Sequence, residues 1–152
     1  MNPEQDFFVV LTSKSSKKIY TNNKTCSFTC QIPAAYNLEG LWDVCLWSLS
    51  ATSQVVQDYI LEEHPCGMLV YTDIVTDTVI GDVTASLLAV LPLPQPKAAT
   101  RFSPNNLAYH RVKVLEPREI SIKLLSQTGR DIEFNVDDTT VLIELHFRRT
   151  PV

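Results

Sequence analysis

The end of the chain carries the pattern that most constrains its fold. Residues 141–149 read Val-Leu-Ile-Glu-Leu-His-Phe-Arg-Arg, so apolar side chains recur at every second position as far as the phenylalanine. Successive side chains of a β-strand point to opposite faces, and this period of two predicts a strand with one face against a core. The other face is mainly polar and carries Glu144, His146 and Arg148. We therefore expect a half-buried strand that closes the core near the end of the sequence.

Related patterns predict strands in the first third of the chain. Residues 7–11 form an uninterrupted apolar run, which predicts a central strand buried on both faces. Residues 28–32 alternate and end at Pro33, because proline cannot continue a central strand. Residues 41–50 alternate with Trp42 and Trp47 on opposite faces, and we expect this aromatic strand to run through the core.

The remaining strands are expected at residues 68–75, within 79–93 after a turn at Gly81-Asp82, at 109–115 and at 120–124. Residues 53–63 fit either a short helix capped by Ser53 or an arm of a β-hairpin. Residues 92–96 contain three prolines and predict an extended surface loop outside any sheet. About eight strands at this spacing predict an all-β fold, a β-sandwich or single jelly roll of antiparallel strands.

Length and charge limit the classes of function. A chain of 152 residues predicts one domain, residues 1–152, whose core needs neither a metal nor a disulfide for stability. The net charge of −4 argues against direct nucleic-acid binding, and Lys14, Lys17 and Lys18 are interpreted as a solvated loop. The acidic start differs from a signal peptide, so we expect no secretion by that route. The longest apolar stretch, residues 85–93, is far below the roughly 20 residues of a membrane helix, so no membrane insertion is expected.

The polar residues predict no catalytic, cofactor or metal site. Cys26 and Cys30 are four apart on an expected strand, about 13 Å, so we expect all four cysteines to stay reduced. Cys66 beside His64 could suggest a thiol nucleophile, although nothing orients it. The carboxylates Asp73, Asp77 and Asp82, and the run Glu62-Glu63-His64, lack the spacing of metal ligands. Asn23-Lys24-Thr25 is a formal glycosylation triplet that we expect to be unused.

Several short blocks occur in a recognisable order from the first strand to the last. They are the apolar strand and serine-rich turn at 11–16, Tyr-Thr-Asn-Asn at 20–23, Leu-Glu-Gly-Leu-Trp-Asp-Val-Cys-Leu at 38–46, Tyr-Thr-Asp-Ile-Val at 71–75, Ile-Gly-Asp at 80–82 and Leu-His-Phe-Arg-Arg at 145–149. Taken in this order, the blocks resemble the jelly-roll virion proteins of Polinton (Maverick) elements and adintoviruses. The chain departs from that family in a shorter segment before the Tyr-Thr-Asp block, in Cys45 where a glycine is expected, and in Ala89 where an arginine is expected.

This resemblance implies a penton-like minor capsid protein, a structural protein of the virion and not an enzyme. Its partners would be further copies of itself, with a pentamer favoured and a trimer possible, and a major capsid protein. It would assemble inside the host cell. A capsid cement or interlocking protein would suit the short middle segment equally well. The alternative from another class is a lectin-like β-sandwich that binds carbohydrate or protein. An enzyme is the third hypothesis and would depend on His64, Cys66 or His146.

A capsid protein acts through its edges, loops and exposed apolar side chains, because assembly buries complementary surface between copies. Aromatic residues and arginine dominate the binding energy of such interfaces. The candidate interface residues are Tyr36, Trp47, Tyr59, Phe102, Arg148 and Arg149. Partial burial in the core is the alternative for the four aromatic residues, and a solvated strand end is the alternative for the two arginines.

Overall fold

The computed structural model describes residues 6–15, 17–32, 36–56, 67–92, 101–102, 104 and 106–150. Within these ranges all regular secondary structure is β-strand. The first sheet consists, in spatial order, of β1 (Phe7–Thr12), β11 (Val141–Arg149), β3 (Trp42–Ala51) and β8 (Arg101–Phe102), and β9 (His110–Arg111) also pairs with β3. The second sheet consists of β2 (Ser27–Gln31), β10 (Glu119–Ser126), β4 (Gly67–Thr72) and β7 (Leu87–Pro92). A separate hairpin joins β5 (Thr78–Ile80) to β6 (Val83–Ala85).

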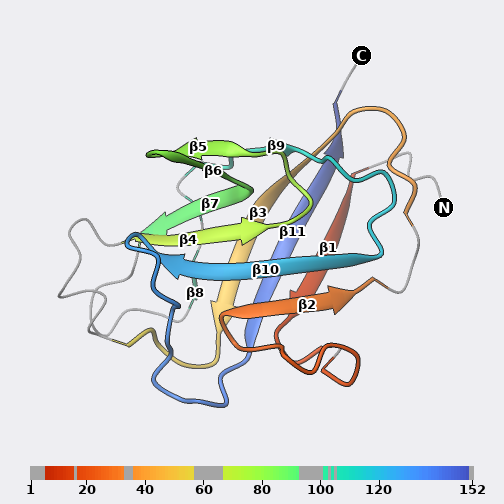
Figure 1. Ribbon diagram of the computed structural model, residues 1–152. Coiled ribbons are helices and arrows are strands. Elements are labelled where there is room, and N and C mark those ends of the chain that lie inside the picture. The colour runs from red at the N-terminus through yellow and green to blue at the C-terminus, as the bar shows by residue number, and fades with distance from the viewer. Residues whose placement is uncertain are drawn as a thin grey trace.

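The chain passes back and forth between the two sheets. β1, β3, β8, β9 and β11 belong to the first sheet, while β2, β4, β7 and β10 belong to the second. Every strand pair in the described part of the chain is antiparallel, and the first and last of these strands lie side by side (Figure 1). This is the connectivity of a jelly roll, and it confirms the all-β sandwich expected from the sequence.

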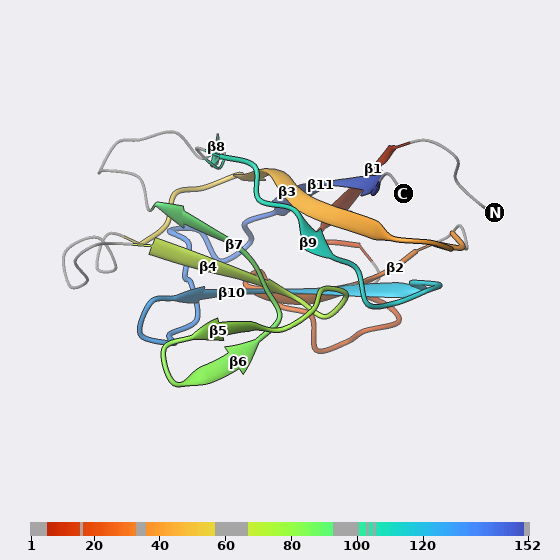
Figure 2. The ribbon, with the colours of Figure 1, turned by 90° about the horizontal axis from the view of Figure 1, so that it is seen from above.

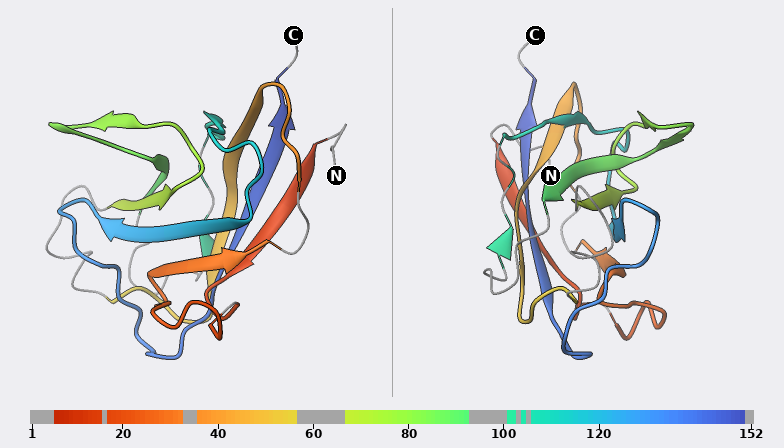
Figure 3. Two further views of the ribbon diagram at one scale, coloured as in Figure 1. Left: turned by 45° about the vertical axis from the view of Figure 1, so that its right-hand side comes forward. Right: turned by 90° about the vertical axis from the view of Figure 1, so that its left-hand side faces the viewer.

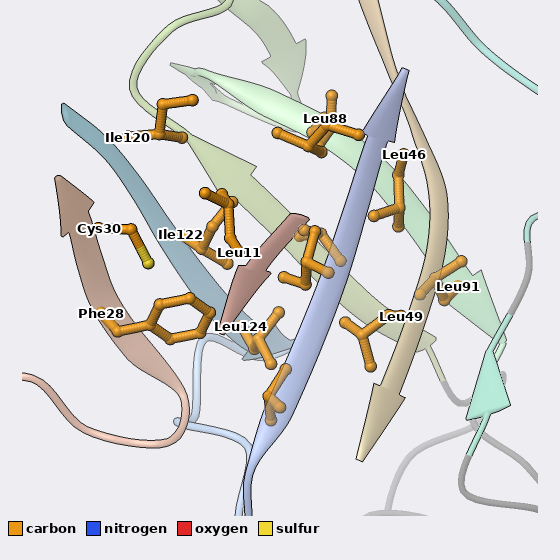
Figure 4. Packing of buried hydrophobic residues seen from close by; sticks show 14 of the residues in the cluster. Leu11, Phe28, Cys30, Leu46, Leu49, Leu88, Leu91, Ile120, Ile122 and Leu124 are labelled. Carbon is orange, nitrogen blue, oxygen red and sulfur yellow. The ribbon is translucent and has the colours of Figure 1, made fainter. Parts of the chain in front are cut away.

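The two sheets lie face to face as two layers (Figure 2). The strands of the first sheet run steeply across those of the second (Figure 3). Figure 4 shows apolar side chains of the two inner faces pointing toward one another, with Leu11, Leu46 and Leu49 from the first sheet. Phe28 and Ile122 come from the second sheet. Both sets are almost fully buried, because each strand turns every second residue into the space between the sheets.

The predicted place of the first strand is wrong. Residues 7–11 were expected to form a central strand buried on both faces, whereas β1 lies at the edge of the first sheet, beside β11. Its outward side chains, Phe8 and Val10, are 49% and 53% exposed. Five consecutive apolar residues carry no alternation, so the pattern could not distinguish an inner face from an outer one.

Further segments differ from their predicted structure in whole or in part. The chain forms the β5–β6 hairpin over residues 78–85, turned at Gly81 with a φ of +59°, before β7 begins at Leu87. Pro92, expected in a loop, pairs with Gly67 at the end of β7, an edge strand where the missing N–H is tolerated. The expected strand at 109–115 is reduced to the two residues of β9 and one bridge from Val112 to Val75. A helix capped by Ser53 is absent from residues 53–56, while 57–63 and 93–96 lie outside the described residues.

Three of the cysteines are within the described part of the chain. Cys26, Cys30 and Cys45 are free and buried, and burial raises the pKa of each thiol. Cys66 lies outside the described residues. None of the described segments forms a helix with the length and apolarity required to cross a bilayer.

Thr72 offers a test of the packing between the sheets. Its side chain is 2% exposed, and its hydroxyl finds no hydrogen-bond partner among the described residues. A buried hydroxyl without a partner costs about 1–3 kcal/mol, so Thr72→Val is expected to raise the free energy of unfolding by about 1 kcal/mol. The measurement is a urea transition monitored by tryptophan fluorescence, in which the midpoint rises while the slope is unchanged.

Thr29→Val provides the matched control in the same sheet. The Thr29 hydroxyl lies 2.7 Å from the Ser121 hydroxyl, so its removal is expected to lower stability by about 1 kcal/mol. If Thr72→Val also lowers stability, the Thr72 hydroxyl has a partner in the folded protein and the prediction is wrong.

Candidate interaction surface

The outer face of the first sheet carries a group of apolar and aromatic side chains. We call this group the outer aromatic face; its members are Phe8 and Val10 of β1, Trp47 of β3, and Leu142 and His146 of β11. Trp47 and Leu142 are each 38% exposed, although they belong to a sheet whose inner face is the core. An exposed cluster of apolar side chains is typical of a surface that contacts another molecule.

Strand pairing brings these residues together from distant parts of the sequence. Phe8 lies opposite His146, and Val10 lies opposite Glu144, in the antiparallel β1–β11 pair. On the other side of β11 the register with β3 shifts between Glu144 and Leu145, so that Trp47 has no partner in the ladder. A bulge of this kind changes the direction of a side chain, and here the indole of Trp47 projects from the outer face of the sheet.

The rings of the outer aromatic face contact one another. The Phe8 and Trp47 ring centroids are 5.3 Å apart in an edge-to-face arrangement. The His146 imidazole lies 4.7 Å from the Phe8 ring and 5.5 Å from the Trp47 ring. Edge-to-face pairs at these distances are favourable by about 0.5–1.5 kcal/mol each beyond the area they bury. The three rings therefore form a preorganised cluster that needs little ordering when a partner covers it.

Polar groups hold the imidazole of His146 in place at the rim of the cluster. The Tyr109 hydroxyl is 2.7 Å from Nδ1 of His146, and the Asp6 carboxylate is 3.6 Å from Nε2. The Arg148 guanidinium lies over the Tyr109 ring, 3.5 Å from its centroid. A cation stacked on a ring is attracted by the negative face of the π system, so Arg148 is tied to its own subunit.

Cys45 lies beneath this rim and is fully buried. Burial raises the pKa of its thiol, although a hydrogen bond with Tyr109 and the charge of Arg148 act in the opposite direction. The pKa of Tyr109 is likewise raised, first by burial and then by its bond with Cys45. Both groups are therefore protonated near neutral pH, which makes Cys45 a structural thiol and a poor nucleophile.

The structure places two of the predicted interface residues, Trp47 and Arg148, on the outer side of the first sheet. Tyr36 instead stacks on Phe7 at 4.5 Å and packs against the core. Arg149 donates a 2.9 Å hydrogen bond to the carbonyl of Glu39, which also accepts one from the indole of Trp42. Tyr36 and Arg149 thus have contacts within the subunit and do not belong to the outer aromatic face.

Two further predicted residues have no described side chain. Tyr59 lies outside the described residues, and of Phe102 only the backbone is described, paired with Leu49 in β8. Sequence reasoning missed Phe8 and Val10, the most exposed members of the outer aromatic face. The only signal for them in the sequence is the apolar run at 7–11, which carries no alternation.

The other sequence candidates take structural roles where they are described. Asp73 accepts a hydrogen bond from the backbone N–H of Ser121, and Asp77 accepts one from the Ser86 hydroxyl. The side chain of Asn23 bonds both the N–H and the C=O of Thr29, each at 2.9 Å, so this glycosylation triplet is part of the fold. Lys14 forms an ion pair with Asp138. Among the described residues no three metal-binding side chains cluster, and His64 lies outside them.

Comparison with known proteins gives a match in structure but not in sequence. No family model matches the chain. No curated protein matches it. A crystal structure of the selenomethionine-labelled mavirus penton protein superposes with a TM-score of 0.64 at 8% sequence identity. The match covers 97% of this chain and 100% of the mavirus chain, so the two share one fold along nearly their whole length.

Proposed function

We propose that this chain is a structural protein of a virion, a penton-like minor capsid subunit that self-assembles. The observation that carries the proposal is the shared fold with a mavirus penton protein over 97% of this chain and all of the other. The ordered sequence blocks at 11–16, 38–46, 71–75 and 145–149 support the same class. At 8% identity the fold can be retained while nearly every surface contact has changed, so assembly needs its own test.

The outer aromatic face is the surface that we assign to the contact between subunits. Phe8, Val10 and Trp47 would lose their remaining exposure in such a contact, and aromatic residues dominate the binding energy of interfaces. The edge strand β1 borders this face and offers backbone groups to a neighbouring chain. A second copy of the chain is the proposed occupant, and a stable contact would cover about 800 Å² on each copy.

A pentamer at a capsid vertex is the favoured assembly, because it follows from the penton-like resemblance. The major capsid protein would then surround it in the virion. A trimer or an interlocking cement protein would use the same outer aromatic face with a different symmetry. In each case the contact is between large, preorganised surfaces, so no cofactor is required.

Sedimentation velocity and negative-stain microscopy on the purified full chain test this proposal. We expect a concentration-dependent shift from monomer to one closed oligomer, with five-fold rings, in the presence of reducing agent. Reducing conditions matter because the described cysteines are free thiols. A strict monomer up to about 100 μM, a concentration at which even a contact of micromolar affinity would be occupied, would overturn self-assembly.

A further inference from the structure

A cavity opens on the outer face of the second sheet, on the side of the sandwich opposite the outer aromatic face. Its volume is about 630 Å³, within the range of about 300–1,000 Å³ that is usual for small-molecule sites. Strands β2, β10 and β4 form the floor, the segment 19–23 forms one wall, and Asp73 and Ser86 line the other. The mechanism of assembly proposed above makes no use of this cavity.

Hydroxyl groups dominate the floor of the cavity. Thr29 of β2 and Ser121 of β10 are opposite each other in the register, and their hydroxyl oxygens are 2.7 Å apart. One step along the sheet, Ser27, Lys123 and Tyr71 form a row across β2, β10 and β4. A serine or threonine hydroxyl can donate one hydrogen bond and accept two, so the Thr29–Ser121 pair keeps capacity for a ligand.

Side-chain bonds to the backbone hold the two walls against the floor. Asn23 bonds the N–H and the C=O of Thr29, which anchors the segment 19–23 to β2. On the other side Asp73 accepts the N–H of Ser121 at 3.0 Å. Desolvation of the Asp73 carboxyl raises its pKa, with the Ser121 bond acting in the opposite direction. The cavity is therefore formed before any ligand arrives, which lowers the entropy that binding must overcome.

Aromatic and charged groups narrow the class of ligand. The Tyr71 side chain is half-buried, and its hydroxyl bonds no other described residue. The Tyr20 hydroxyl at the wall donates to the carboxylate of Glu119. Lys123 and Asp73 contribute one charge of each sign to the lining, so the cavity has no excess of positive charge for a phosphate or sulfate.

We propose that this cavity binds a neutral carbohydrate. A pyranose ring has an apolar C–H face, which packs on an aromatic ring such as Tyr71, and a set of hydroxyls that both donate and accept hydrogen bonds. The floor offers the complementary groups in Thr29, Ser121 and Ser27, with Asp73 as a further acceptor. This binding would be a function additional to assembly, because the two surfaces belong to different sheets.

Saturation-transfer difference NMR on the full chain tests the proposal, with glucose, galactose, mannose and N-acetylglucosamine as separate probes. The method reads the signals of the sugar, and a titration gives the dissociation constant for a monomer as well as for an assembled ring. We expect transfer to the ring C–H protons of at least one sugar, with a dissociation constant in the millimolar range. Absence of transfer to all four sugars at about 10 mM, tenfold above such a constant, would overturn the proposal.

Variants then locate the binding. Tyr71→Ala is expected to weaken the binding about three- to tenfold, the range for loss of one aromatic contact, and Tyr71→Phe should retain most of it. Val90→Ala removes an exposed side chain of the same sheet outside the cavity lining and is expected to leave the sugar affinity unchanged. Equal effects of Tyr71→Ala and Val90→Ala, or displacement of the sugar by inorganic phosphate, would contradict a neutral-carbohydrate site here. The sedimentation result is independent of this test, so the failure of either proposal can be recognised separately.

Discussion

Replacing Phe147 by alanine is expected to lower the free energy of unfolding by about 3–5 kcal/mol. Phe147 is 1% exposed and its ring stacks on that of Phe7 with centroids 4.9 Å apart. It lies on β11, which pairs with both β1 and β3 at the centre of the first sheet. The truncation would leave a cavity in the core between the sheets. A loss of this size is a fifth or more of the stability of a typical domain, about 5–15 kcal/mol.

Guanidinium denaturation monitored by tryptophan fluorescence measures this loss. Phe8→Ala is the matched control, because it removes the same ring from a half-exposed position on the outer face of the same sheet. Only its contacts with Trp47 and His146 would be lost, so we expect a decrease of about 1 kcal/mol. Equal losses from the two variants would mean that the two sheets do not enclose Phe147 as described.

Placing a carboxylate on the outer aromatic face is expected to abolish self-association. Val10→Glu introduces a negative charge directly opposite Glu144 in the register. Among the described residues no ion pair involves Glu144, so no cation at this place would neutralise the new carboxylate. An unpaired charge buried in an interface costs several kcal/mol, which corresponds to at least a hundredfold weaker association. The folded subunit should remain intact, because in the monomer this position is 53% exposed and the charge stays in water.

Val90→Glu is the control for this experiment. Val90 is also 53% exposed and also lies on an edge strand, but it belongs to β7 of the second sheet. We expect the control to sediment like the unmodified chain, while Val10→Glu sediments as a monomer. Loss of assembly in the Val90 variant with retention in the Val10 variant would move the interface to the second sheet.

Much of the fold was predictable, because alternating polar and apolar residues indicate a strand with one buried face. Residues 28–32, 120–124 and 141–149 show that pattern, and they correspond to β2, β10 and β11. The assignment of residues 41–50 to a core strand is also confirmed, since β3 lies between β11 and the short strands β8 and β9. The predicted strand at 109–115 failed because its alternation is not accompanied by a partner along its whole length.

The candidate surfaces were much harder to predict from the sequence than the strands. Trp47 was predicted as an interface residue because it lies on the less apolar face of its strand and because aromatic residues dominate the binding energy of interfaces. Its neighbour Phe8 comes from a strand 39 positions earlier in the sequence, and their contact exists only because β11 lies between β1 and β3. The cavity of the second sheet is a similar case, since Thr29, Tyr71 and Ser121 come from three strands.

Local residue patterns are sufficient to predict that this protein is built of strands and, for most strands, which side chains turn toward the core. Those properties depend on the alternation of side chains along a strand, which is a local property of each segment. Three other features follow from the arrangement of the whole chain in space. β1 is an edge strand, Phe8 and Val10 join Trp47 on an exposed face, and the hydroxyls of Thr29, Tyr71 and Ser121 from three strands line one cavity. These properties depend on which strands pair, and pairing between strands distant in the sequence is settled by the packing of the whole sandwich.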